Sequence, residues 1–178
     1  MDRTASVDGR LFLAALPDAV TASRIFKLAS ALKRAHGFSG RLIAPERLHV
    51  SLFFLGRLDL ERAPRRAVGD VRMPPFEVSF DRTASFCGRP GSRPFVLIGG
   101  GGLGQLKSFR QGLAAELARE GMRRLARTSF EPHVTLLYDA HGVDEYPLGE
   151  PVSWTINEIV LIGSKSGHAH LAKWRLRG

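Results

Sequence analysis

Two stretches of this chain, Arg47-Leu-His-Val-Ser-Leu-Phe-Phe54 and Glu131-Pro-His-Val-Thr-Leu-Leu-Tyr138, share the core His-Val-Ser/Thr-Leu. Both are apolar and rich in β-branched or aromatic residues, a composition that predicts strands. Side chains two positions apart on a strand point to the same side. The pairs expected to share a face are therefore His49 with Ser51 and His133 with Thr135. Two such strands facing each other across a groove would present two imidazoles and two hydroxyls.

The similarity extends beyond these two motifs. His49 and His133 are 84 positions apart, and the same shift places residues 10–56 on residues 94–140 without a gap. Each segment then reads as strand, helix, glycine, polar loop and histidine strand. A repeat on this scale predicts a duplicated unit. Duplication usually brings pseudo-two-fold symmetry, which places the two histidine strands opposite each other.

Size and composition limit the class of protein. A chain of 178 residues with 44% hydrophobic residues fits one compact domain, 1–178, made of two small lobes. No apolar run approaches the roughly 18 residues of a membrane span, and residues 1–9 lack the apolar segment of a signal peptide. Cys87 is the single cysteine, which excludes an intramolecular disulfide and a cysteine-based zinc site. We therefore expect a cytoplasmic monomer.

The net charge of +9 comes from 26 basic and 17 acidic residues. A basic surface of this size favours a polyanionic partner, and RNA is the expected one.

Periodicity and turn residues predict the other elements. The predicted helices cover residues 19–35, 58–70 and 103–119, and the predicted loops cover 39–47 and 140–151. The predicted strands cover residues 10–16, 48–55, 76–80, 83–86, 95–98, 130–138, 152–156, 158–162 and 171–176.

A glycine-rich stretch between a predicted strand and a predicted helix matches the dinucleotide-binding pattern G-x-G-x-x-G at Gly99, Gly101 and Gly104. The acidic residue of that pattern belongs at a strand end about 20 positions further on, but Glu116 and Glu120 lie within or at the end of the next helix. The stretch is therefore interpreted as a flexible connection, and no cofactor is expected.

Two histidines support a specific chemistry, because an imidazole can take or give a proton near neutral pH. Placed on opposite sides of a phosphodiester, His49 and His133 can run an in-line displacement without a metal. One activates the incoming oxygen and the other protonates the departing oxygen. Ser51 and Thr135 would then hold the non-bridging phosphate oxygens. The His168-x-His170 pair in a predicted loop is interpreted as solvated or as part of the groove lining.

The paired motifs, His49-Val-Ser-Leu and His133-Val-Thr-Leu, resemble those of the 2H phosphoesterase superfamily. The resemblance is greatest to RNA 2′,3′-cyclic phosphodiesterases, also called 2′-5′ RNA ligases. It covers nearly the whole chain, and the segments that carry it include 10–17, 130–136 and 159–164 with Trp174.

The resemblance implies an α+β fold of two pseudo-symmetric lobes, with antiparallel sheets flanking a central groove and helices packed outside. It implies metal-independent hydrolysis of a terminal 2′,3′-cyclic phosphate to a 2′-phosphate, with 2′-5′ ligation as a related reaction. By position in the motifs, His49 is the acid that protonates the leaving 3′-oxygen and His133 the base that activates water. The near symmetry of the motifs leaves the reverse assignment open.

One position departs from the family pattern. Some members carry a phosphate-binding arginine five positions after the second motif histidine, where this chain has Tyr138. Tyrosine donates a hydrogen bond but carries no charge at pH 7, so Lys165 or Arg127 is expected to supply the cation. Phe53, on the expected His49 face, and Phe54 are candidates for stacking on a base.

Three other readings remain open. The same site would suit small cyclic nucleotides or 2′-5′ oligonucleotides. A non-catalytic RNA-binding module is disfavoured by the second imidazole, which a binder does not need. A dinucleotide-binding protein rests on the glycine pattern alone.

Overall fold

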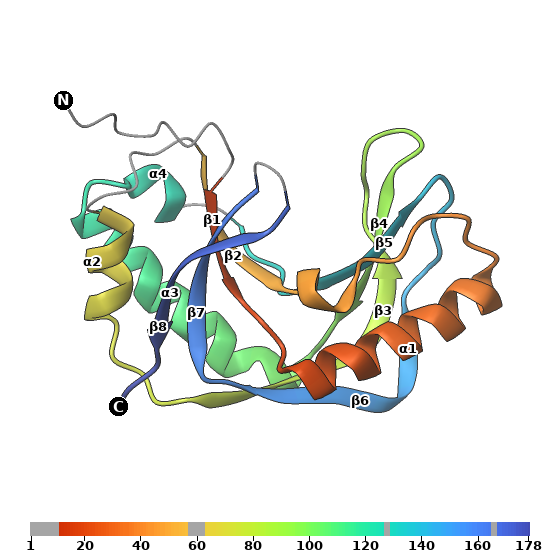
Figure 1. The fold of residues 1–178 in the computed structure, drawn as a ribbon, viewed down its shortest axis with the longest axis horizontal. Coiled ribbons are helices and arrows are strands. Elements are labelled where there is room, and N and C mark those ends of the chain that lie inside the picture. The colour runs from red at the N-terminus through yellow and green to blue at the C-terminus, as the bar shows by residue number, and fades with distance from the viewer. Residues whose placement is uncertain (1–10, 57–62, 127–128, 165–166) are drawn as a thin grey trace.

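A computed structural model describes residues 11–56, 63–126, 129–164 and 167–178 of the chain (Figure 1). Its helices are α1 (Ala19–His36), α2 (Ala63–Asp70), α3 (Gly104–Arg119) and α4 (Arg123–Ala126), with 3-10 turns η1 (Pro45–Arg47) and η2 (Gly101–Leu103). Its strands are β1 (Leu11–Ala15), β2 (Val50–Gly56), β3 (Phe76–Ser85), β4 (Arg93–Ile98), β5 (Val134–Asp139), β6 (Tyr146–Ile156), β7 (Glu158–Gly163) and β8 (Ala169–Arg175). No described helix has the length and hydrophobicity needed to cross a membrane.

The strands form two halves that meet at one point. Their order is β6-β3-β4-β5-β2-β1-β7-β8, and all neighbours are antiparallel. The two histidine strands, β2 and β5, lie side by side at the centre and pair through Val50 and Val134 alone. In Figure 1 the two halves rise on either side of this point. The predicted α+β fold with two antiparallel halves is confirmed.

Local signals set the ends of the first helix. The Asp18 side chain accepts hydrogen bonds from the Thr21 backbone N–H at 2.9 Å and from the Thr21 hydroxyl at 2.7 Å. These bonds satisfy a helix N-terminus, and they lower the pKa of Asp18. Gly37 ends α1 with φ of 68°, a left-handed conformation that glycine adopts without strain. The predicted cap and the predicted glycine stop are both confirmed.

Each repeat sends its helix to the other half of the molecule (Figure 1). α1 follows β1 but packs on the half that holds β4, where the rings of His36 and Phe95 lie 5.8 Å apart. α3 follows β4 but packs on the half that holds β2, where Arg110 Nε donates to the Leu52 carbonyl at 3.1 Å. The exchange places both helices on one side of the sheet and leaves the other side of the central strands open.

The main core lies between the sheet and the helices, and its largest fully buried side chains include Phe80, Phe95, Phe109 and Leu13. Two smaller clusters cover the opposite face, one in each half. The first contains Phe12, Ala14, Val160 and Ile162, and the second contains Ala84, Val96 and Ile98.

Both histidine strands carry a β-bulge at the same place. The partners of β2 skip Leu52, and those of β5 skip Leu136, each three positions after the motif histidine. A bulge inserts one unpaired residue and reverses the alternation of faces beyond it. The freed carbonyls are bonded elsewhere: Arg110 donates to Leu52, and the Ile43 N–H donates to Leu136 at 2.8 Å.

The bulges correct one site prediction. Phe53 was expected on the His49 face, but only 2% of it is exposed, and it packs in the core. Phe54 occupies the groove face instead and is 64% exposed. The repeat is also not free of gaps. Leu13 pairs with Phe53 as Phe95 pairs with Leu137, so the first strands of the repeats are offset by 82 positions, whereas the histidines are offset by 84.

Three predicted boundaries also differ. Residues 146–151 were expected in a loop but belong to β6, which pairs with β3. Residues 83–86 do not begin a new strand, because β3 runs without a break to Ser85. The helix predicted over 58–70 is described from Ala63 onward, and its first predicted turn lies outside the described residues.

The glycine-rich connection is closely packed. A Cβ on Gly99 would lie 2.6 Å from the Ser79 carbonyl oxygen, and one on Gly102 would lie 2.5 Å from the Ser79 Cβ. Only glycine lets this turn approach β3 so closely. Packing therefore accounts for two of the glycines in the stretch that resembles a dinucleotide-binding pattern.

Asp139 connects the loop after α1 to the end of β5. Its Oδ2 accepts the Gly40 N–H at 2.7 Å and the Ser39 N–H at 2.8 Å, and its Oδ1 accepts the His141 N–H at 3.2 Å. These bonds, with that from Gly40 the strongest, lower the pKa of Asp139 to about 2.

We expect Asp139→Asn to lower the thermal unfolding midpoint at pH 7. A carboxyl whose pKa falls on folding stabilises the fold above its unfolded pKa of about 3.9, and that stabilisation is lost as the pH falls through the folded value. The difference in midpoint between the variant and wild type should therefore shrink from pH 4 towards pH 2. Asp144→Asn makes the same change at an exposed position and should have no such effect. A pH-independent difference for Asp139→Asn would contradict this role.

Candidate active site between the two half-sheets

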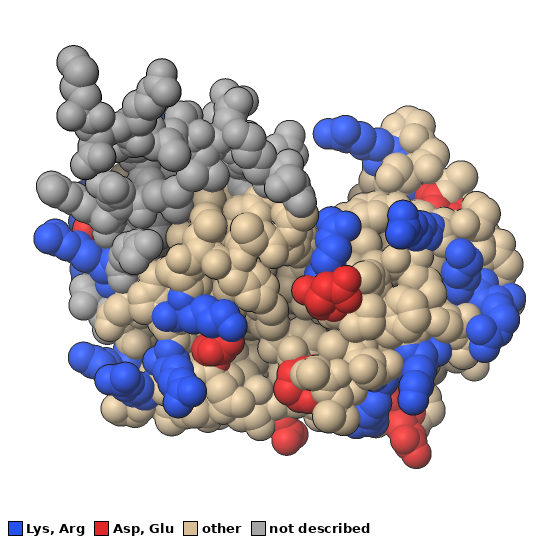
Figure 2. Space-filling model, viewed as in Figure 1, with Lys and Arg blue, Asp and Glu red and all other residues tan. Residues whose placement is uncertain are grey.

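A groove of about 310 Å³ lies over the central strands, on the face opposite α1 and α3. Figure 2 shows a notch between the two halves, with basic side chains on both of them. The groove is lined by Phe12, Ile43, Arg47, His49, Ser51, Phe54, His133, Thr135, Tyr138, Ser164 and His168. Five of the six residues that the sequence predicted for the site are therefore together, and Phe53 is absent from this lining.

His49 is held by hydrogen bonds on both ring nitrogens. Its Nδ1–H donates to the Arg47 carbonyl at 2.8 Å, and its Nε2 lies 3.1 Å from the Ser51 hydroxyl. The first bond fixes the Nδ1–H tautomer, so the Ser51 hydroxyl donates to Nε2. The Phe12 ring lies 5.0 Å away. Burial, more than the nearby His133 and Arg47 charges, lowers the pKa of His49.

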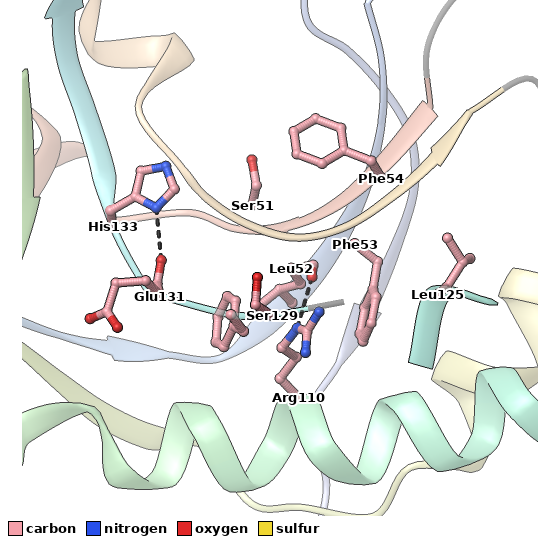
Figure 3. Close-up of a pocket in the computed structure, with 10 residues that line it drawn as sticks. Ser51, Leu52, Phe53, Phe54, Arg110, Leu125, Ser129, Glu131 and His133 are labelled. Carbon is pink, nitrogen blue, oxygen red and sulfur yellow. Dashed lines mark hydrogen bonds between the residues drawn. The ribbon is translucent and has the colours of Figure 1, made fainter. Parts of the chain in front are cut away.

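His133 repeats this arrangement in the other half. Its Nδ1–H donates to the Glu131 carbonyl at 2.8 Å, as Figure 3 shows. The Phe86 ring meets it edge-on at 5.0 Å. Glu131 and Arg47 precede their histidines by the same two positions. Each imidazole is thus fixed by a backbone carbonyl behind it and an aromatic ring beside it, and its Nε2 is left for a substrate.

The register of the central strands brings the hydroxyls to the histidines. Val50 pairs with Val134 in an antiparallel arrangement, so His49 lies opposite Thr135, and Ser51 lies opposite His133. All four side chains line the groove and are half-buried. Each histidine therefore has one hydroxyl on its own strand and another across the centre of the groove.

Two exposed aromatic side chains occupy equivalent places beyond the bulges. Phe54 and Tyr138 each follow their motif histidine by five positions, and they are 64% and 50% exposed. Both line the groove. Large aromatic surfaces left open beside polar groups are suited to stacking on a nucleobase.

Arg47 and His168 complete the groove, and the sequence did not single them out as site residues. Arg47 is the one Lys or Arg among the described residues that line it. The His168 ring lies 5.0 Å from the His49 ring and 5.4 Å from that of Phe12. Burial, followed by the nearby His49 and Arg47 charges, lowers the pKa of His168 to about 4. His168 is therefore neutral at pH 7, and Arg47 carries the positive charge.

Other candidates lie elsewhere or outside the described residues. His141 lies beside Asp139, 3.0 Å from its carboxylate, and stacks on Phe38. Lys165 and Arg127, the cations expected to replace an arginine at Tyr138, lie outside the described residues. Within the described part of the chain, no three His, Cys, Asp or Glu side chains form a cluster that could hold a metal ion.

Comparisons with known proteins agree with this geometry. A family model described as the 2′-5′ RNA ligase superfamily matches residues 17–168. An Archaeoglobus fulgidus protein named RNA 2′,3′-cyclic phosphodiesterase is 33% identical over 113 residues, 62% of this chain and 62% of that relative. An Escherichia coli protein of the same name is 30% identical over 151 residues, 78% of this chain and 81% of the relative. The crystal structure of E. coli LigT complexed with 3′-AMP has a TM-score of 0.74 at 28% identity, covering 96% of this chain and 99% of that chain.

Proposed function

This chain belongs to the 2′-5′ RNA ligase superfamily, and from that premise we propose that its groove hydrolyses the 2′,3′-cyclic phosphate end of RNA to a 2′-phosphomonoester. One observation carries the proposal: two imidazoles, each fixed through Nδ1–H to a backbone carbonyl, occupy equivalent places on two strands that pair at a single point. The names of both relatives, RNA 2′,3′-cyclic phosphodiesterase, support the same reaction.

The reaction needs one base and one acid. Nε2 of His133 takes a proton from a water molecule, whose oxygen attacks phosphorus. The bond from phosphorus to the 3′-oxygen breaks on the opposite side, and Nε2 of His49 gives that oxygen a proton. Burial lowers the pKa of His49 in the free protein, and the negative phosphate opposes this effect. Substrate binding therefore favours the protonated His49 that the acid role requires.

The other polar groups hold the phosphate. Hydroxyls of Ser51 and Thr135 donate to the non-bridging oxygens, one from each half of the groove. Arg47 supplies a positive charge beside them, which stabilises the charge that builds up on those oxygens during displacement. Phe54 and Tyr138 stack on the terminal base, with Phe54 in the place that the sequence had assigned to Phe53.

The test is hydrolysis of an RNA oligonucleotide that ends in a 2′,3′-cyclic phosphate, in the presence of EDTA. We expect wild-type protein to produce the 2′-phosphomonoester, identified by its resistance to a 3′-specific phosphatase. An oligonucleotide ending in a 3′-phosphate serves as the unreactive control. Adenosine 2′,3′-cyclic phosphate, assayed alongside, reports whether the small cyclic nucleotide is the better substrate. Absence of hydrolysis of both cyclic phosphates would contradict the proposed function.

A further inference from the structure

A second cavity, of about 170 Å³, adjoins the groove on one side (Figure 3). It shares three lining residues with the groove, namely Ser51, Phe54 and His133. His49 and Arg47 line the groove but not this cavity. The two spaces therefore meet at the reaction centre, and the second one opens towards His133 alone.

The walls of this cavity suit a nucleobase. Three aromatic residues, Phe53, Phe54 and Phe130, line it. The Arg110 guanidinium lies between the Phe53 and Phe130 rings, at 4.2 and 4.6 Å from their centroids. Arg110 is 8% exposed, and Figure 3 shows it rising from α3 below Ser129. Aromatic faces stack on a base of any sequence, and the arginine and the serine hydroxyl can bond to its polar edge.

The position of the cavity indicates which nucleoside it would hold. In-line displacement places the entering oxygen and the leaving oxygen on opposite sides of phosphorus. With His49 on the side of the leaving 3′-oxygen, the groove holds the nucleoside that carries the cyclic phosphate. The entering oxygen then approaches from the side of His133, which is where the second cavity lies.

We infer that the second cavity is the binding site for an acceptor nucleoside that presents its 5′-hydroxyl to the cyclic phosphate. This inference rests on the proposed function and on its assignment of His133 as the base. Nε2 of His133 takes the 5′-hydroxyl proton, the 5′-oxygen bonds to phosphorus, and the bond from phosphorus to the 3′-oxygen breaks. His49 gives its proton to the 3′-oxygen. The product is a 2′-5′ linkage, and no co-reactant is consumed.

The reverse reaction gives the sharper measurement. Adenylyl-(2′→5′)-adenosine places a nucleoside in each space, whereas adenosine 2′-(methyl phosphate) has the same diester and leaves the second cavity empty. For wild-type protein we expect kcat/KM to be at least about ten-fold higher for the dinucleotide, a contribution typical of one stacked base. Ser129→Trp fills the cavity and should reduce this ratio towards one. Ser129→Ala, which removes the hydroxyl without adding bulk, should leave most of it.

The outcomes separate this inference from the function on which it rests. Hydrolysis of adenosine 2′,3′-cyclic phosphate by the same preparations reports the proposed function and the integrity of the fold. If that hydrolysis occurs but wild-type protein cleaves both diesters equally well, the second cavity does not bind the leaving nucleoside. A ratio unchanged by Ser129→Trp would overturn the inference in the same way.

Discussion

We expect His49→Ala and His133→Ala each to reduce hydrolysis of an RNA 2′,3′-cyclic phosphate by at least about 100-fold, the contribution typical of one positioned acid or base. Both imidazoles line the groove, and the backbone around them should be little affected, because His49 and His133 are only half-buried. Initial rates in EDTA with saturating and sub-saturating substrate provide the measurement. His36→Ala, which changes a histidine at the end of α1, serves as the control and should keep wild-type activity.

A substrate with a better leaving group separates the two roles. In 3′-deoxyadenosine 2′-(4-nitrophenyl phosphate), 4-nitrophenolate replaces the 3′-oxygen as the leaving group and needs no proton. His49→Ala should then regain most of the lost rate, whereas His133→Ala should stay impaired. The opposite result would reverse the assignment of acid and base. Full activity of both variants on the cyclic phosphate would remove these histidines from the mechanism.

The second large effect is expected at Arg47. A charged hydrogen bond to the phosphate contributes roughly 1.5–3 kcal/mol, so Arg47→Ala should lower kcat/KM by about 10- to 150-fold. Arg47→Lys should retain part of this, because lysine keeps the charge but not the two-pronged geometry. Arg66→Ala, at an exposed position on α2, is the matched control. Equal activity of Arg47→Ala and wild type would show that another cation binds the phosphate.

Two further measurements test how Arg47 acts. Tyr138 lines the same groove, at the position where the family resemblance places an arginine, so Tyr138→Arg should restore activity to Arg47→Ala. The Arg47 charge also contributes to the lowered pKa of His49. Its removal favours protonated His49, so the alkaline limb of the kcat/KM profile should move to higher pH in Arg47→Ala. A limb that stays in place would mean that the Arg47 charge does not reach His49.

The sequence predicted the parts of this protein that depend on local pattern. Two His-Val-Ser/Thr-Leu motifs in a repeat were sufficient to predict paired strands, the inward-facing histidines and the family, and all of these are confirmed. The cap at Asp18 and the stop at Gly37 were predicted for the same reason, since both depend on the chain within one helical turn.

Features that depend on an irregular strand or on distant contacts were not predicted. Strict alternation placed Phe53 on the groove face, and the bulge at Leu52 reverses that alternation. A signal was present in Leu52-Phe53 and Leu136-Leu137, where two consecutive apolar residues interrupt the pattern in both motifs. The first half of β6 resembled a loop because Pro147, Gly149 and Pro151 are typical of turns.

The groove residues outside the motifs follow the same rule. Arg47 lies in the turn η1, and His168 precedes β8, more than 110 positions after His49. Neither follows a periodic pattern that relates it to the histidines. Their approach to His49 depends on how β7 and β8 pack beside β1, which is a property of the whole fold.

The single pair between Val50 and Val134 determines how the jaws of the enzyme can open. A strand advances about 3.3 Å per residue, so each histidine lies one such step from the joint, and Phe54 and Tyr138 lie about four steps away. Rotation of one half about the joint would therefore move the aromatic side chains roughly four times as far as the imidazoles. The enzyme could widen its mouth for a long or structured RNA end while the spacing of its two proton-transfer groups hardly changes. Tolerance of varied RNA ends and constancy of the chemical step would then have one origin, the position of the pivot.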